Sequence, residues 1–353
     1  MGIYVLNGLN GVIDIVNEYA SSIWTVQFYG QNDFQLVVPV GKKTMSDFQL
    51  GRLLVREEDI TANGYKNVMI IEGLQMDFDA DKGWMLTATG RGLKSILARR
   101  IVWGQATMSG KVETSIRSII TDNVISPSLT NRTIDDFVLD SAKNFPEEAD
   151  IQLFGENIAE WLESVCMEYG YGWDVEIINS KYTFKLYKGT DRSYNQSSVP
   201  PVVFSPDFDN LLSSQYKFNR ADYKNAALVG GEGEGTSKTT VSVGGAQGLS
   251  RYEAYIDGSS VSSNGEIITL ATYKELLKTY GREQLTHTSY EANFSGSIDS
   301  HGMFEINSDY FLGDIVEVDN GIGVTATARI SEIIYAEDTN GTSTVPTFTE
   351  WEV

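Results

Sequence analysis

The sequence has a single cysteine, two histidines and seven prolines among 353 residues. One cysteine cannot form an internal disulfide, which fits assembly in a reducing cytoplasm. One cysteine and two histidines are also too few for the usual zinc motifs. No apolar run approaches the roughly 20 residues of a membrane-spanning helix, and the first residues lack the basic segment of a signal peptide. We therefore expect no membrane insertion of this chain.

Positive charge is scarce as well. The 27 Lys and Arg stand against 48 Asp and Glu, which gives a net charge of −21. A general nucleic-acid binder needs cations to displace counterions from phosphate, so this class is disfavoured, as is attachment to an anionic membrane surface. Hydrophobic residues at 41% and aromatic residues at 11% provide enough material for packed cores. The length corresponds to roughly two to three domains.

The first hundred residues show the pattern of short β-strands. Apolar and β-branched runs are separated by loops rich in Asn and Gly, and 79–83 reads as the polar tip of a hairpin. The expected strands are 3–6, 12–16, 23–29, 34–40, 53–56, 67–73 and 84–89. Seven short strands at this spacing are typical of a barrel or a sandwich.

The pattern changes near residue 91, where helical spacing begins. Segments near 93–97 and 112–120 are amphipathic, and the clearest helix covers 155–169, with Gly170 placed to end it. A hairpin of 173–178 and 182–187 follows. The chain then returns to β-strands, with one more helix near 270–287.

Few residues offer catalytic chemistry. His287 lies near the end of a predicted helix, His301 lies in a predicted turn, and Cys166 occupies an apolar helix position, where a thiol is inert without a positive neighbourhood. We interpret all three as structural or solvated. Paired carboxylates for glycoside hydrolysis stay open, because 48 acids always offer a pair and nothing selects one.

Two acidic segments resemble ligand sites only in part. The spacing of Asp77, Asp79 and Asp81 is that of a calcium-loop fragment, but Lys82 and Ala88 stand where the required Gly and Glu would be. We interpret this segment as a plain hairpin tip.

The glycine-rich segment 230–235 matches neither phosphate-binding pattern, and its two glutamates would repel a phosphate. We interpret it as a strand connection. Glu232, Glu234 and Lys238 remain candidates for contacts with a partner, and we expect no cofactor and no metal.

Seven stretches, taken in order and spacing, resemble the siphovirus tail-hub protein family, which includes the N-terminal hub part of tail-associated lysins. They are 34–39 (FQLVVP), 54–59 (LVREED), 89–93 (TGRGL), 99–105 (RRIVWGQ), 203–211 (VFSPDFDNL), 229–235 (VGGEGEG) and 311–316 (FLGDIV). The resemblance extends over most of the chain, although no single stretch is a chemical signature.

The resemblance implies an α+β, mainly β fold, with two tail-tube-like β-barrel domains around a smaller α+β region. The implied domains are a barrel at 1–103, an α+β domain at 104–214 whose last part can return to the first barrel, and a second barrel at 215–353 that contains the helix near 270–287. Three chains would form a ring that closes the tail tube, adapts sixfold to threefold symmetry and gates DNA passage.

The resemblance also implies partners and a location. The expected partners are two further copies of the chain, the distal tail protein, the tape-measure protein and tail fibre or receptor-binding proteins, with DNA passing without specific binding. The expected location is the virion tail tip, after assembly in the host cytoplasm, and we expect no enzymatic activity. Two alternatives stay open: a receptor- or carbohydrate-binding tail protein, and a tail-tip peptidoglycan hydrolase. The sequence does not distinguish a siphophage from a prophage or a contractile tail-like particle.

Overall fold

The computed structural model describes residues 2–81, 83–265, 267–288, 291–298, 303–319, 321 and 325–352. Its regular structure is mainly β, and its longer helices lie between residues 112 and 286. The α+β, mainly β class expected from the sequence is therefore confirmed. None of the helices in these ranges is long and apolar enough to cross a membrane.

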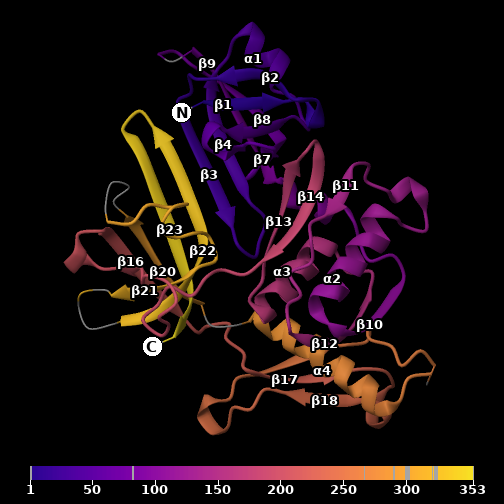
Figure 1. The fold of residues 1–353 in the computed structure, drawn as a ribbon. Helices are drawn as coiled ribbons and strands as arrows, with labels where there is room; N and C mark the ends of the chain where they lie inside the picture. The colour runs from indigo at the N-terminus through magenta and orange to yellow at the C-terminus, as the bar shows by residue number, and fades with distance from the viewer. Residues whose placement is uncertain are drawn as a thin grey trace.

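One sheet of thirteen strands connects regions near the two ends of the chain (Figure 1). Its N-terminal strands are β1 (Ile3–Leu6), β2 (Val12–Val16), β3 (Ser21–Gln27), β4 (Asp33–Pro39), β5 (Leu53–Arg56), β8 (Met69–Asp79) and β9 (Gly83–Gly92), with helix α1 (Lys42–Asp47) between β4 and β5. Its C-terminal strands are β15 (Val203–Phe204), β16 (Leu211–Asn219), β20 (Glu291–Ile298), β21 (Ile315–Asp319), β22 (Thr325–Asp338) and β23 (Gly341–Glu352).

The strand order runs β16-β20-β23-β22-β3-β4-β9-β8-β5-β1-β2, with β21 joined to β22 and β15 joined to β21. This path is open at β16 and at β2. No barrel therefore closes among the strands that the structure describes within one chain.

Strand β22 joins the C-terminal strands of this sheet to the N-terminal ones. Its first residues pair with β21, from Thr325 opposite Asp319 to Arg329 opposite Ile315. Its second half leaves β21 and pairs with β3, with 332–338 opposite 21–27. The ladder to β23 shifts register twice between these halves, and such irregularities bend a strand and increase its twist. One strand thus connects the C-terminal strands to the N-terminal ones.

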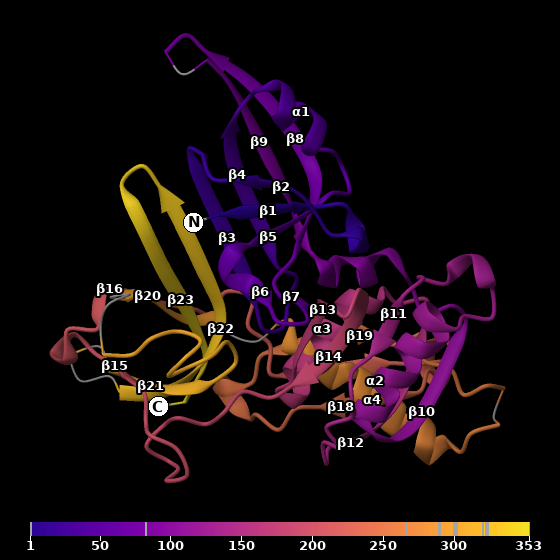
Figure 2. The same ribbon diagram turned by 45° about the horizontal axis from the view of Figure 1, so that its top comes forward.

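The long hairpin β8–β9 extends beyond the body of the molecule, whereas the long hairpin β22–β23 lies beside β3 (Figure 2). Strand β5 pairs only with Met69 and Ile70 of β8, so the rest of β8 has β9 as its ladder partner. The expected hairpin with its tip at 79–83 is confirmed, with longer arms than expected. At the tip the backbone N–H of Asp81 donates to Asp79 Oδ1 (2.9 Å), as in an ordinary turn.

The middle of the chain forms two smaller sheets and two helices. Strands β10 (Gln105–Lys111) and β12 (Glu148–Phe154) pair with each other. A five-stranded sheet has the order β11 (Phe137–Leu139), β14 (Lys181–Tyr187), β13 (Gly172–Ile178), β7 (Gly64–Tyr65) and β6 (Ile60–Thr61). Strands β6 and β7 come from the N-terminal region, so the two regions share this sheet.

Helix α3 (Ile158–Tyr169) illustrates how local sequence fixes an element, and α2 (Val112–Ile120) forms where the sequence predicts it. The Asn157 side chain accepts from the backbone N–H groups of Ala159 and Glu160 and so caps the first turn of α3. Gly170 ends α3 in the left-handed conformation, at φ 66°, which glycine adopts without a Cβ penalty. The helix predicted at 155–169 is confirmed at its C-terminal end, and it begins at Ile158, after the Asn157 cap.

Residues 226–286 form a small unit between β16 and β20, drawn in orange in Figure 1. It contains β17 (Ala226–Gly230), β18 (Thr240–Val243), β19 (Glu253–Asp257) and α4 (Leu270–Thr286), and its strands form a sheet of their own. Helix α4 packs against α3 and β12 of the middle region. The domain boundaries expected after residues 103 and 214 stay predictions.

Phe28, directly after β3, is fully buried where three regions meet. Its ring makes edge contacts with the rings of Tyr29 and Tyr187, at centroid distances of 4.7 and 5.3 Å. Gly172 and Gly313 lie so close that a Cβ on either would come within 2.2 Å of this ring. The three segments therefore meet around one aromatic side chain.

Candidate functional site

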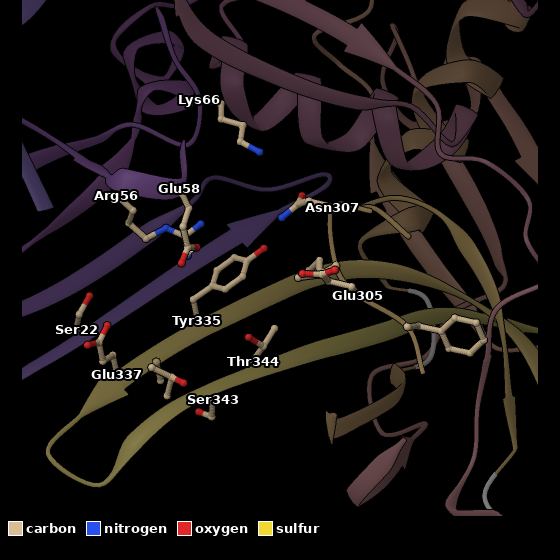
Figure 3. A pocket seen from close by; sticks show the side chains of 14 residues that line it. Ser22, Arg56, Glu58, Lys66, Glu305, Asn307, Tyr335, Glu337, Ser343 and Thr344 are labelled. Carbon is tan, nitrogen blue, oxygen red and sulfur yellow. Dashed lines mark ion pairs between the residues drawn. The ribbon is translucent and has the colours of Figure 1, made fainter. Parts of the chain in front are cut away.

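A cleft of about 570 Å³ lies between the N-terminal strands and the β22–β23 hairpin (Figure 3). We call it the junction cleft. It is lined by Ser22, Arg56, Glu58, Lys66, Phe304, Glu305, Ile306, Asn307, Tyr335, Ala336, Glu337, Thr342, Ser343 and Thr344. Its walls come from β3, β5, β22, β23 and the segment 304–307, so the cleft depends on the β3–β22 pairing.

Arg56 is the buried charge of the junction cleft. Its Nε donates to Asp59 Oδ2 (2.7 Å), and Asp59 Oδ1 accepts from Asn67 Nδ2 (2.7 Å). The guanidinium lies 3.9 Å from the ring centroid of Tyr335 on β22. Burial alone would lower the pKa of Arg56, but the charge of Asp59 and its hydrogen bond raise it. Arg56 therefore stays charged and attaches the end of β5 to β22.

Among the described residues, the junction cleft is lined by hydroxyl groups and by no imidazole. Ser22, Ser343 and Thr344 line it, whereas His287 lies elsewhere and His301 is outside the described residues. Its three carboxylates, Glu58, Glu305 and Glu337, come from separate elements. No group of three or more His, Cys, Asp or Glu among the described residues could hold a metal ion.

A second cleft, of about 380 Å³, lies between α3 and α4. We call it the helix-pair cleft. It is lined by Leu153, Glu156, Asn157, Glu160, Trp161, Glu163, Ser164, Tyr280, Glu283, Gln284 and His287.

His287 Nε2 lies 2.5 Å from Ser164 Oγ in the helix-pair cleft. Ser164 already donates its hydroxyl proton to the carbonyl oxygen of Glu160 (3.0 Å). The contact between Ser164 and His287 connects α3 to the end of α4.

Cys166 is fully buried in α3, as its helix position predicts. Burial raises the pKa of its thiol. We expect a thiol reagent at pH 8 to react with the native chain at least about 100-fold more slowly than with the urea-unfolded chain, which should show one thiol. Absorbance of the released reagent group measures both rates, and equal rates would show that this helix position is open.

The sequence-predicted candidates Glu232, Glu234 and Lys238 lie in the β17–β18 connection and line neither cleft. The Glu232 carboxylate accepts from Ser262 Oγ (2.8 Å), Ser263 N (2.8 Å) and Ser263 Oγ (2.6 Å). The bonds from Ser263, above all, lower its pKa. Glu234 is exposed and Lys238 is half-buried. Glu232 thus holds the 262–263 loop, while a partner contact for the three residues stays a prediction.

Sequence reasoning did not identify either cleft. Arg56 belongs to one of the stretches that carry the family resemblance. Its stacking on Tyr335, which is 279 positions away, has no signal in the neighbouring sequence. The sequence analysis singles out no role for Glu283, which is 4% exposed in the structure. His287, expected at a helix end, does lie at the end of α4 and is exposed.

Comparisons with known proteins give one family and a set of similar folds. The model of the family described as Siphovirus ReqiPepy6 Gp37-like protein matches residues 2–348. No curated protein sequence matches the chain.

Three solved structures share the fold over nearly their whole length. The 43 kDa tail protein of prophage MuSo2 from Shewanella oneidensis has a TM-score of 0.61 at 13% identity, covering 99% of this chain and 98% of that one. A tail protein from Neisseria meningitidis has a TM-score of 0.57 at 14% identity, covering 99% and 96%. Prophage tail protein gp18 from Listeria monocytogenes has a TM-score of 0.53 at 11% identity, covering 98% and 94%. At these identities the likeness shows the fold.

Proposed function

This chain belongs to the siphovirus Gp37-like tail protein family, and from that membership we propose that it is the structural hub at the tip of a phage tail. The observation that carries the proposal is the family match over residues 2–348, and the full-length likeness to three tail proteins supports it. In this proposal the chain is a component of the virion tail and not an enzyme.

The architecture supports a ring-forming role. The large sheet has an N-terminal group of strands, β1–β5, β8 and β9, and a C-terminal group, β15, β16 and β20–β23, joined through β22. We assign to these groups the role of two tube-like units per chain. Three chains then present six such units to the sixfold tail tube. The ring of three chains thereby adapts the sixfold tube to a threefold tip. In this proposal neighbouring copies complete the tube-like units, since the sheet path of one chain is open among its described strands.

We expect three copies of the chain at the tail tip of the assembled particle. The isolated chain should be a monomer at low salt, because a net charge of −21 per copy makes the copies repel one another. Cryo-electron microscopy of the particle counts the copies, and native mass spectrometry gives the state of the purified chain. Two or six copies at the tip would refute the trimer.

The remaining parts of the proposal follow from this position. A hub at the tip would contact the distal tail protein, the tape-measure protein and fibre or receptor-binding proteins, and DNA would pass through its channel. Carboxylates along the channel would repel the DNA backbone and prevent it from adhering. The trimer reconstruction tests this at the same time, because a channel lined by as many Lys and Arg as Asp and Glu would contradict it.

A further inference from the structure

The helix-pair cleft carries a concentration of negative charge without a matching cation among its lining residues. Four glutamates line it: Glu156, Glu160 and Glu163 beside or on α3, and Glu283 on α4. Neither a lysine nor an arginine lines it. The nearby guanidinium of Arg282 instead has its Nε 3.8 Å from Glu168 Oε1, outside the cleft.

Two polar groups in the wall of this cleft are buried without a partner. Glu283 and Trp161 are each 4% exposed, and Glu283 Oε1 and Trp161 Nε1 have no hydrogen-bond partner. A buried carboxylate oxygen or indole N–H that lacks a partner costs free energy. Native proteins rarely retain such groups unless something satisfies them in the functional state. One group is an acceptor and the other a donor, so a ligand that satisfies both must bring a donor and an acceptor.

The geometry selects the kind of cation. Among the described residues, no three His, Cys, Asp or Glu side chains are grouped so that they could hold a metal ion. The glutamates of this cleft therefore do not form a metal site. A cleft of about 380 Å³ has room for a long side chain rather than a bare ion. An ammonium or guanidinium group would satisfy the carboxylate, and a peptide carbonyl would accept from the indole N–H.

We propose that the helix-pair cleft binds a lysine or arginine side chain of another protein, with Glu283 as its counter-ion and Trp161 as a donor to the adjoining peptide carbonyl. This interaction does not depend on the trimeric hub. It gives the small unit 226–286 a role in attaching a partner, because α4 supplies one wall of the cleft and α3 the other.

The titration behaviour of Glu283 agrees with such a role. Burial, followed by the charges of Glu168 and Glu156, raises the pKa of Glu283 to about 8, and Arg282 lowers it in part. At neutral pH the empty cleft therefore holds a proton on Glu283. A bound cation would replace that proton, so its affinity should increase as the pH rises from 6.5 to 8.5.

The probes for the test are the N-acetyl, N-methylamide derivatives of arginine and lysine, added to the full 15N-labelled chain. The six tryptophans give indole N–H signals, and Trp161→Phe identifies the one to follow. We expect this signal to shift with a saturable, millimolar dissociation constant. At pH 8.5, where Glu283 is ionised, Glu283→Gln should weaken binding at least about tenfold, because it removes a charge-assisted hydrogen bond. It should also reduce the increase in affinity between pH 6.5 and 8.5.

Controls separate this site from general charge effects. Glu275→Gln, at an exposed position of the same helix, should change the affinity less than twofold. The uncharged norleucine derivative and MgCl₂ at equal ionic strength should not shift the Trp161 signal. A shift of equal size with norleucine or Mg²⁺, the absence of a saturable shift with both basic probes, or unchanged binding in a folded Glu283→Gln variant would each overturn the proposal.

Discussion

Replacing Phe28 with alanine is expected to lower the free energy of unfolding by about 3–5 kcal/mol. The side chain is fully buried among Tyr29, Tyr187, Gly172 and Gly313, so its removal leaves a cavity in the place where three regions meet. Glycines cannot extend side chains into that cavity. The loss would be a large part of the roughly 5–15 kcal/mol that stabilises an ordinary domain.

Urea unfolding followed by circular dichroism measures this change. Phe78→Ala is the control, because Phe78 is 62% exposed at the β8–β9 tip, where its ring lies 5.3 Å from that of Trp84, and it should change the free energy of unfolding of the monomer by about 1 kcal/mol or less. If the two variants lose equal stability, Phe28 does not hold the three regions together.

Glu283→Gln is expected to stabilise the free chain at alkaline pH. In the folded chain burial raises the pKa of Glu283 to about 8, from an ordinary value of 4.5. A raised pKa means that the fold retains the proton, so this contribution to stability is fully present below pH 4.5 and is lost as the pH rises through 8. Since each pKa unit corresponds to roughly 1–2 kcal/mol, the wild-type chain should lose several kcal/mol between pH 4.5 and 9.

Glutamine keeps the size of the side chain and carries no charge, so the variant should be more stable than the wild type at pH 9 and similar to it near pH 4.5. Thermal unfolding at pH 5, 7 and 9 measures the difference. Burial also raises the pKa of Glu168, so the variant should still lose some stability as the pH rises. Glu275→Gln should follow the wild-type curve, and a parallel curve for Glu283→Gln would contradict the assignment.

Elements defined by adjacent residues could be predicted from the sequence. Helix α3 follows from its apolar spacing, from the cap at Asn157 and from Gly170, all within one segment. The β13–β14 hairpin follows from two apolar runs around Asn179 and Ser180, which both adopt positive φ. These signals are local, so no knowledge of distant residues is needed.

Features that depend on distant residues could not be predicted. Lys94 appears in the sequence as a surface charge, yet it is 1% exposed and donates to the carbonyls of Gln27 and Gly30. Its burial depends on Trp173, whose ring lies 4.9 Å from Nζ. The same holds for the two clefts, since Arg56 meets Tyr335 and Ser164 meets His287 only after the regions have packed.

The pairing of β3 with β22 has a consequence for synthesis on the ribosome. Gln27 and Glu332 are hydrogen-bonded neighbours separated by 305 residues. At a translation rate of about 5–20 residues per second, β22 is synthesised roughly 15–60 s after β3. During that time β3 has an open strand edge, and newly made chains on neighbouring ribosomes carry the same edge. Slowing translation between codons 30 and 330 should therefore increase aggregation of the nascent chain, whereas slowing it before codon 20 should not.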